Sequence, residues 1–127
     1  MKKIPTSSIN VKIVGVGGAG GNALLRMLKG GLTNAEVIAL NTDVQALKKL
    51  KEIRSFAIGP NATKGLGSGG HPDIGRKAIR ESIEQIGIML KGSDMVFIAA
   101  GMGGGTGTGA SATVADIARK QGALTVG

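Results

Sequence analysis

Residues 94–109 of the chain read DMVFIAAGMGGGTGTG, and they hold the most specific pattern in the sequence. Residues 95–100 form a short apolar run, which is typical of a strand buried on both faces of a sheet. Residues 103–109 contain only glycine and threonine, and apolar residues at helical spacing follow at positions 110, 114, 117 and 118. A strand that passes through such a loop into a helix can wrap backbone N–H groups around a phosphate chain at the positive end of the helix dipole.

The same alternation of short apolar runs and helical spacing occupies the rest of the chain. Further strands are predicted at residues 11–16, 37–40, 56–58 and 123–126, and helices around residues 24–28, 46–50, 79–90 and 110–122. One long helix is predicted because an apolar stripe runs from Ile79 through Ile83 to Leu90, and Gly122 is predicted to end the last helix. The alternation predicts a single α/β domain, a doubly wound, Rossmann-like parallel sheet with strand order 3-2-1-4-5. Ligands of such sheets bind beyond the carboxyl ends of the strands, where the loops after the first and fourth strands face each other.

The composition excludes several classes of protein. With 127 residues, of which 42% are hydrophobic and 19% charged, the chain is predicted to fold as one domain. It has no cysteine and one histidine, so disulfides, thiolate metal ligands and a multi-histidine metal site are excluded. The sequence contains no apolar run of about 18 residues, so no membrane span is predicted. Residues 1–8 also lack the apolar segment of a signal peptide. We therefore expect a cytoplasmic protein with no direct membrane insertion.

The net charge of +8 is spread along the chain, with one denser group at Lys48, Lys49, Lys51 and Arg54. Such a group can bind nucleic acid, or it can form a solvated face at the C-terminus of a helix, where cations suit the helix dipole. The second interpretation is favoured because the chain has no Tyr or Trp, and neither Phe lies in the basic group to stack on bases. No nucleic-acid partner is expected.

The first glycine-rich loop along the chain, GVGGAGGN, begins at Gly15 and follows the first predicted strand. Gly15, Gly17 and Gly20 satisfy the G-x-G-x-x-G pattern of dinucleotide-binding folds, and Asp43 stands where a ribose-binding acid belongs. An NAD-binding Rossmann module is therefore one hypothesis for this loop. The glycine–threonine loop described above favours a different class, because a Rossmann dehydrogenase has one phosphate loop and this chain has two on adjacent strands.

A third glycine-rich segment, GLGSGGHP at residues 65–72, precedes the predicted long helix. Pro72 and Asp73 suit the first turn of that helix. The segment is either a flexible connection or a lid on the terminal phosphate of a nucleotide, and its place beside two phosphate loops favours the lid. His71 is expected to be a surface residue at the helix start, the alternative being a contact with the terminal phosphate.

Three stretches carry a resemblance to a known family: NTD at residues 41–43, GLGSGGHPDIG at 65–75 and DMVFIAAGMGGGTGTG at 94–109. Over about residues 11–127 the chain resembles the tubulin/FtsZ family of GTPases. The resemblance implies a truncated tubulin/FtsZ GTPase domain, in which residues 1–10 are a flexible N-terminus and the rest is the N-terminal part of the GTP-binding domain. It also implies GTP or GDP as the ligand, with Mg²⁺ bound through phosphates and water.

The resemblance also assigns the nucleotide contacts. Thr42 is placed beside the ribose and phosphates, and the backbone N–H groups of Gly69 and Gly70 are assigned to the γ-phosphate. The first loop is assigned phosphate contacts, with its asparagine also orienting the nucleotide, through Gly17, Gly18, Ala19, Gly20, Gly21 and Asn22. The α- and β-phosphates are assigned to Gly104, Gly105, Thr106, Gly107, Thr108 and Gly109.

No catalytic residue and no protein ligand of a metal is assigned here, because the 8 carboxylates include no obvious general-base pair. In the family, the groups that recognise guanine follow later in the chain, and an acidic loop of the next subunit activates water. The resemblance thus implies a cytoskeletal cell-division GTPase that assembles head to tail into filaments and forms the cytokinetic ring at the division site, with membrane-tethering and division proteins as partners. These 127 residues alone are expected to bind GTP weakly and to hydrolyse none. The NAD-binding module remains the alternative.

Overall fold

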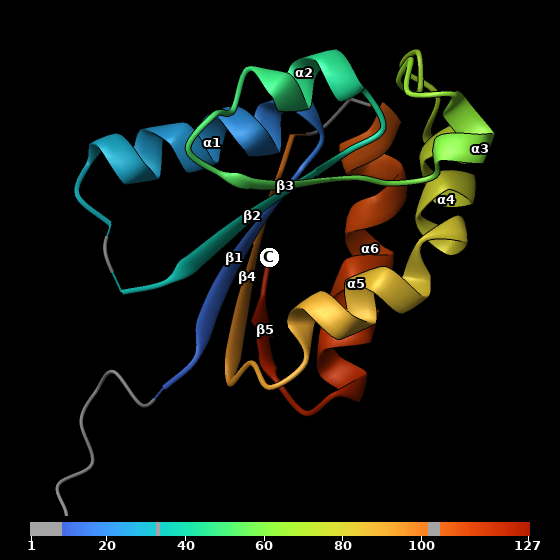
Figure 1. Cartoon of the computed structure of the whole chain (residues 1–127). Helices are drawn as coiled ribbons and strands as arrows, with labels where there is room; N and C mark the ends of the chain where they lie inside the picture. The colour runs from blue at the N-terminus through green and yellow to red at the C-terminus, as the bar shows by residue number, and fades with distance from the viewer. Residues whose placement is uncertain (1–8, 33, 102–104) are drawn as a thin grey trace, which may run out of the picture.

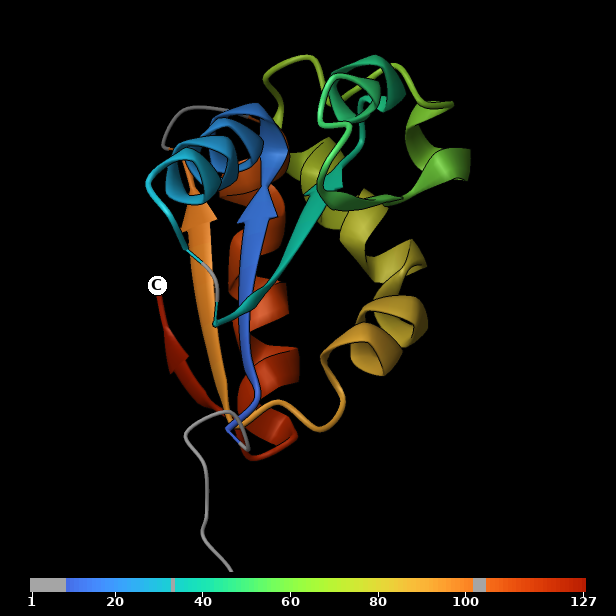
Figure 2. The same ribbon diagram turned by 60° about the vertical axis from the view of Figure 1, so that its left-hand side comes forward.

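The computed structural model describes residues 9–32, 34–101 and 105–127, and within them the chain forms one parallel β-sheet. The strands, in chain order, are β1 (Val11–Val16), β2 (Glu36–Asn41), β3 (Arg54–Ala57), β4 (Met95–Ala100) and β5 (Leu124–Val126). Their order across the sheet is β3-β2-β1-β4-β5, which confirms the predicted order. Because all neighbouring pairs are parallel, the carboxyl ends of the strands share one edge of the sheet, at the top of Figure 2.

Helices cover both faces of this sheet. In chain order, the helices of the described residues are α1 (Gly17–Lys29), α2 (Val44–Lys48), α3 (Pro60–Thr63), α4 (Pro72–Glu81), α5 (Ile83–Leu90) and α6 (Gly105–Lys120). α1 and α2 lie on one face, and α4, α5 and α6 lie on the other, as Figure 1 shows. This is the doubly wound α/β architecture that the sequence predicts. None of these helices is long and apolar enough to cross a membrane.

Each face of the sheet has its own apolar core. On one face, Leu24 of α1 and Leu47 of α2 belong to a cluster with Ile13 and Ala39 of the strands. The cluster on the other face joins the strands to α4, α5 and α6, and its members include Val14, Val16, Ile38, Leu40, Val96, Ile79, Ile86, Leu90, Val114 and Ala118. Burying each large aliphatic side chain contributes about 1.5–3 kcal/mol. The two cores hold the strands, and therefore the loops at their carboxyl ends, in place.

The prediction of one long helix at residues 79–90 is wrong, because the helix breaks at Ser82. Ser82 has φ −112° and ψ 15°, and it separates α4 from α5. Its buried hydroxyl accepts a hydrogen bond from the backbone N–H of Gly59, at 3.0 Å. Ile83, which the pattern placed on the buried stripe, is 40% exposed as a result of the break. Apolar spacing alone could not reveal the break, because Ile79 and Ile86 are buried on either side of it.

Two further local features follow from backbone chemistry. The short helix α3, which the sequence did not predict, has Pro60 in its first turn and is too short to show a periodic pattern. Gly122 ends α6 with φ +88°, and its N–H donates to the carbonyl of Arg119 while the N–H of Ala123 donates to that of Ala118. This pair of bonds is a Schellman motif and confirms the predicted cap.

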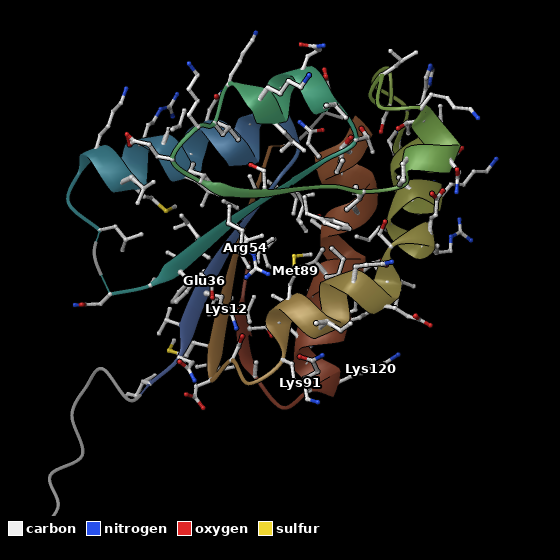
Figure 3. The ribbon with its side chains drawn as sticks, in the orientation of Figure 1. Lys12, Glu36, Arg54, Met89, Lys91 and Lys120 are labelled. Atoms are coloured by element: carbon white, nitrogen blue, oxygen red, sulfur yellow. The ribbon has the colours of Figure 1, made fainter. Side chains whose placement is uncertain are left out.

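An ionic contact joins the amino ends of three strands, far from the carboxyl edge. Glu36 of β2 accepts a hydrogen bond from Arg54 of β3 at 2.7 Å, and Lys12 of β1 lies 3.9 Å from the same carboxylate (Figure 3). Because Glu36 and Arg54 are largely exposed, this contact contributes little to stability. It lies at the amino ends of the strands, away from the loops at their carboxyl ends.

Candidate functional site

Loops that are far apart in the chain meet at the carboxyl edge of the sheet and enclose a cleft of about 340 Å³. It lies between the start of α1, the β2–α2 connection, the loop before α4 and the start of α6. Its lining residues are Gly17, Gly18, Asn41, Thr42, Asp43, Ala46, Leu66, Gly67, Ser68, Gly69, Gly70, Gly105, Thr106 and Gly107. A second cleft of about 200 Å³ shares four of these residues, Gly17, Gly18, Asn41 and Ala46. The two clefts therefore adjoin.

The clefts bring together most of the site residues predicted from the sequence. The larger cleft is lined by Gly17, Gly18, Thr42, Gly69, Gly70, Gly105, Thr106 and Gly107, and the smaller one also by Gly21 and Asn22. The remaining predicted residues that the structure describes line neither cleft: Ala19, Gly20, Thr108 and Gly109. Gly104 lies outside the described residues.

Two of the residues outside the clefts are glycines that close packing requires. A Cβ atom on Gly20 would lie 2.5 Å from the carbonyl oxygen of Ala99 in β4. A Cβ atom on Gly109 would overlap the backbone of Pro72, where α6 packs against α4. These two glycines let the helices approach their neighbours closely, which places the helix starts at the cleft.

The two predicted phosphate loops touch each other. Gly17, which begins α1, has φ +79°, and a Cβ atom there would lie only 2.9 Å from the backbone nitrogen of Gly107 in α6. No side chain caps α1, and neither α1 nor α6 has an acidic residue in its first turn. The first N–H groups of a helix need an acceptor from outside the helix, and they carry its positive dipole end. An anion in the cleft would supply that acceptor.

Asn41 is a cleft residue that the sequence did not single out. It ends β2, is 6% exposed, and lines both clefts. Its Oδ1 atom accepts the backbone N–H groups of Thr42 at 2.8 Å and of Asp43 at 3.3 Å. These two donors fix the side-chain amide, so its Nδ2 group is the part available to a ligand. The signal in the sequence was the NTD stretch itself, of which only Thr42 was assigned to the site.

Ser68 is a second cleft residue that the sequence did not single out. Its hydroxyl lies 3.1 Å from that of Thr42 and 2.8 Å from that of Thr106. The hydroxyls of Thr42 and Thr106 are themselves 2.6 Å apart, and all three residues are buried. The three come from separate segments of the chain, so no pattern within one segment of sequence could reveal this cluster.

The cleft offers few ligands to a metal ion. Among the described residues, no three His, Cys, Asp or Glu side chains gather closely enough to hold one. Asp43 is the carboxylate residue among those lining the larger cleft, and its Oδ1 caps α2 by accepting the N–H groups of Gln45 and Ala46. Mg²⁺ prefers six oxygen ligands in an octahedron, so here it would take most of them from phosphates and water.

His71 directly follows Gly70, a residue of the larger cleft, whereas Lys49 belongs to the smaller cleft. His71 is exposed and precedes α4, and its side chain makes no capping hydrogen bond. This location agrees with the expected surface residue at a helix start. Lys49, from the basic group noted in the sequence, lines the smaller cleft beside Asn22. Among the described residues that line the two clefts, it is the one with a cationic side chain, which could attract an anion.

The fold and the cleft together define a protein of the doubly wound α/β class, with two glycine-rich helix starts in contact at the switch point of the sheet. Residues 10–127 match the model of the Tubulin/FtsZ family, GTPase domain, and the chain belongs to this family. Family membership argues against the NAD-binding alternative, as did the presence of the glycine–threonine loop at residues 103–109.

Solved structures agree with this assignment. The chain is similar to an empty FtsZ dimer from M. jannaschii, with 46% identity, a TM-score of 0.87, and coverage of 91% of this chain and 34% of that one. CetZ2 from Haloferax volcanii, a GTPγS-bound protofilament, shares the fold at 24% identity and a TM-score of 0.79, over 92% of this chain and 38% of that one. A Clostridium botulinum phage TubZ shares it at 20% identity and a TM-score of 0.66, over 89% and 35%. The chain thus spans about a third of the length of the FtsZ structure.

Proposed function

We propose that the chain binds the phosphates of GTP or GDP in the larger cleft, as the phosphate-binding part of a GTPase. The observation that carries this proposal is the contact between Gly17 and Gly107, which sets two glycine-rich helix starts side by side. One helix start suits a single phosphate, whereas two converging ones suit a diphosphate or triphosphate, since both dipoles then favour the same anion.

The proposed contacts follow the walls of the cleft. The first loop, from Gly17 to Asn22, and the second, from residue 104 to residue 109, would hold the α- and β-phosphates mainly through backbone N–H groups. Gly69 and Gly70, which line the cleft from the loop before α4, would receive the γ-phosphate. Mg²⁺ would accompany the nucleotide through phosphate oxygens and water. Glycine occupies most of these positions, and a bare backbone lets phosphate approach closely.

For the whole protein we propose GTP hydrolysis at the contact between subunits of a head-to-tail filament. The described residues supply a cradle for phosphate, and a neighbouring subunit would supply the group that orients the attacking water. The proposal draws support from the relatives, since the FtsZ structure is described as a dimer and the CetZ2 structure as a GTPγS-bound protofilament. A cytoskeletal role in cell division, in the cytoplasm at the division site and with membrane-tethering partners, completes it.

The test is a titration of the ¹⁵N-labelled chain with GTP, GDP and NAD, followed by the amide signals of Gly17, Gly18, Gly105 and Gly107. We expect these signals to shift with GTP and GDP and to be unaffected by NAD at the same concentration. Weak binding does not prevent the measurement, because chemical shifts report millimolar affinities. Binding of NAD in preference to GTP, or no response of these amides to any nucleotide, would contradict the proposal.

A further inference from the structure

Three hydroxyl groups form a closed ring in the wall of the larger cleft. The ring runs from Thr42 to Thr106 over 2.6 Å, from Thr106 to Ser68 over 2.8 Å, and from Ser68 back to Thr42 over 3.1 Å. The three residues are only 1–6% exposed. Thr42 follows β2, Ser68 lies in the loop before α4, and Thr106 is the second residue of α6, so the ring joins three walls of the cleft.

The ring joins protein to protein, and in its closed arrangement it leaves no hydroxyl hydrogen for a phosphate. A hydroxyl carries one hydrogen and two lone pairs, so three hydroxyls close a ring by each donating once and accepting once. All three hydrogens are then used, and a phosphate oxygen needs a donor. The side chains of Thr42, Ser68 and Thr106 therefore act on a nucleotide through the backbone that they position.

The backbone that Ser68 positions is that of Gly69 and Gly70. These glycines have φ +60° and +77°, and Gly65 and Gly67 on the other side of Ser68 also have positive φ. A segment so rich in glycine has many accessible conformations, and ordering it costs conformational entropy. Ser68 supplies the anchors, through its hydroxyl in the ring and through its carbonyl, which accepts the N–H of His71 at 3.0 Å.

The anchored segment lies directly against the start of α6. A Cβ atom on Gly105 would lie 2.8 Å from the Cβ of Ser68 and 2.7 Å from the backbone nitrogen of His71. The ring thus sets the distance between the N–H groups of residues 69 and 70 and those at the helix start. In the proposed site, that distance separates the donors to the third phosphate from the donors to the first two.

We propose that Ser68 is a positioning residue that sets the preference of the site for GTP over GDP. By ordering Gly69 and Gly70 before the ligand arrives, it lowers the entropic cost of engaging the γ-phosphate. GDP has no γ-phosphate and does not use the Gly69 and Gly70 donors, so its affinity does not depend on Ser68. This inference rests on the proposed function, since it requires phosphates in the cleft.

The test compares GTP and GDP affinities of the whole 127-residue chain and its Ser68→Ala variant by NMR titration. We expect GTP affinity to fall about fivefold or more, and GDP affinity to stay within about twofold. The GTP-specific shifts of the Gly69 and Gly70 amides should shrink in parallel. Ser93→Ala is the matched control, because Ser93 is also buried but its hydroxyl donates to the Leu90 carbonyl on the far side of the fold. It should change neither affinity.

The outcomes separate this inference from the proposed function. Equal changes in GTP and GDP affinity, or no change in either, would overturn the role of Ser68 while nucleotide binding by the unaltered chain still stood. Failure of the unaltered chain to bind either nucleotide would overturn both. If Ser68→Ala does not fold, Ser68→Cys takes its place, because a thiol keeps the shape but is a weak hydrogen-bonding group. It should lower the GTP preference in the same direction.

Discussion

The side-chain oxygen of Thr42 lies 2.6 Å from that of Thr106, although 64 positions separate the two residues in the chain. Thr42 stands just beyond the carboxyl end of β2, and Thr106 stands in the first turn of α6. Both are almost fully buried. Their hydrogen bond ties the β2–α2 connection to the helix start on which the proposed phosphate site depends.

Replacing Thr106 with Val is predicted to destabilise the chain by about 1–3 kcal/mol, because the buried hydroxyls of Thr42 and Ser68 lose a shared partner. Urea unfolding at equilibrium measures the change. Thr125→Val is the control, because the hydroxyl of Thr125 makes one local bond to the Ala123 carbonyl and its residue is only partly buried. Equal stability of the Thr106 variant and the unaltered chain would show that the ring contributes nothing.

Replacing Gly18 with Val is predicted to abolish nucleotide binding without lowering the melting temperature. A Cβ atom on Gly18 has no atom within 4 Å, and the residue lines both clefts, so the new side chain would occupy only the space meant for phosphate. The same substitution at Gly107 would be a less specific test of binding, because a Cβ there would lie 3.1 Å from the carbonyl oxygen of Val16 and 3.2 Å from that of Gly101 and would also disturb the fold. Undiminished GTP affinity in a folded Gly18→Val chain would place the phosphates elsewhere.

Replacing Asn41 with Asp is predicted to weaken GTP binding at least tenfold while the chain stays folded. The carboxylate can still accept the N–H groups of Thr42 and Asp43, but it brings a negative charge and no donor to the cleft. Calorimetric titration with GTP gives the affinity, and circular dichroism checks the fold. An unchanged affinity would mean that the Asn41 amide faces no phosphate.

Replacing Ser82 with Ala is predicted to lower the free energy of unfolding by about 1–3 kcal/mol, since the buried N–H of Gly59 loses its acceptor. Nucleotide binding should be unaffected, because Ser82 lies outside both clefts. Denaturant titration tests the first part and GTP titration the second. A variant as stable as the unaltered chain would show that the α4–α5 break does not depend on this hydroxyl.

The chain alone is predicted not to hydrolyse GTP. In the presence of Mg²⁺, phosphate should appear no faster with the chain than in the same GTP solution without it. Phosphoryl transfer requires a group that orients the attacking water, and the carboxylate at the larger cleft, Asp43, is engaged in capping α2. A colorimetric phosphate assay over several hours measures the release. Robust turnover by the purified chain would show that the catalytic groups lie within these residues.

The strands, the two glycine-rich helix starts and the cap at Gly122 could all be predicted because each depends on neighbours in sequence, and the alternation of strands and helices then predicted the sheet order. A buried parallel strand is a short apolar run, and a loop that receives phosphate is a cluster of glycines before a helix. Gly17 and Gly107 could also be expected to face each other, since strand order alone brings the loops after β1 and β4 to one crevice.

The break at Ser82 and the hydroxyl ring could not be predicted in this way. Ser82 interrupts a stripe that stays apolar on both sides, and its partner, Gly59, lies 23 positions away. Ser68 looked like one more small residue in a glycine-rich connection, and its bonds to Thr42 and Thr106 span 26 and 38 positions. Periodicity and glycine spacing report the local backbone, whereas a buried side-chain hydrogen bond exists only after separate segments have packed and removed water from both partners.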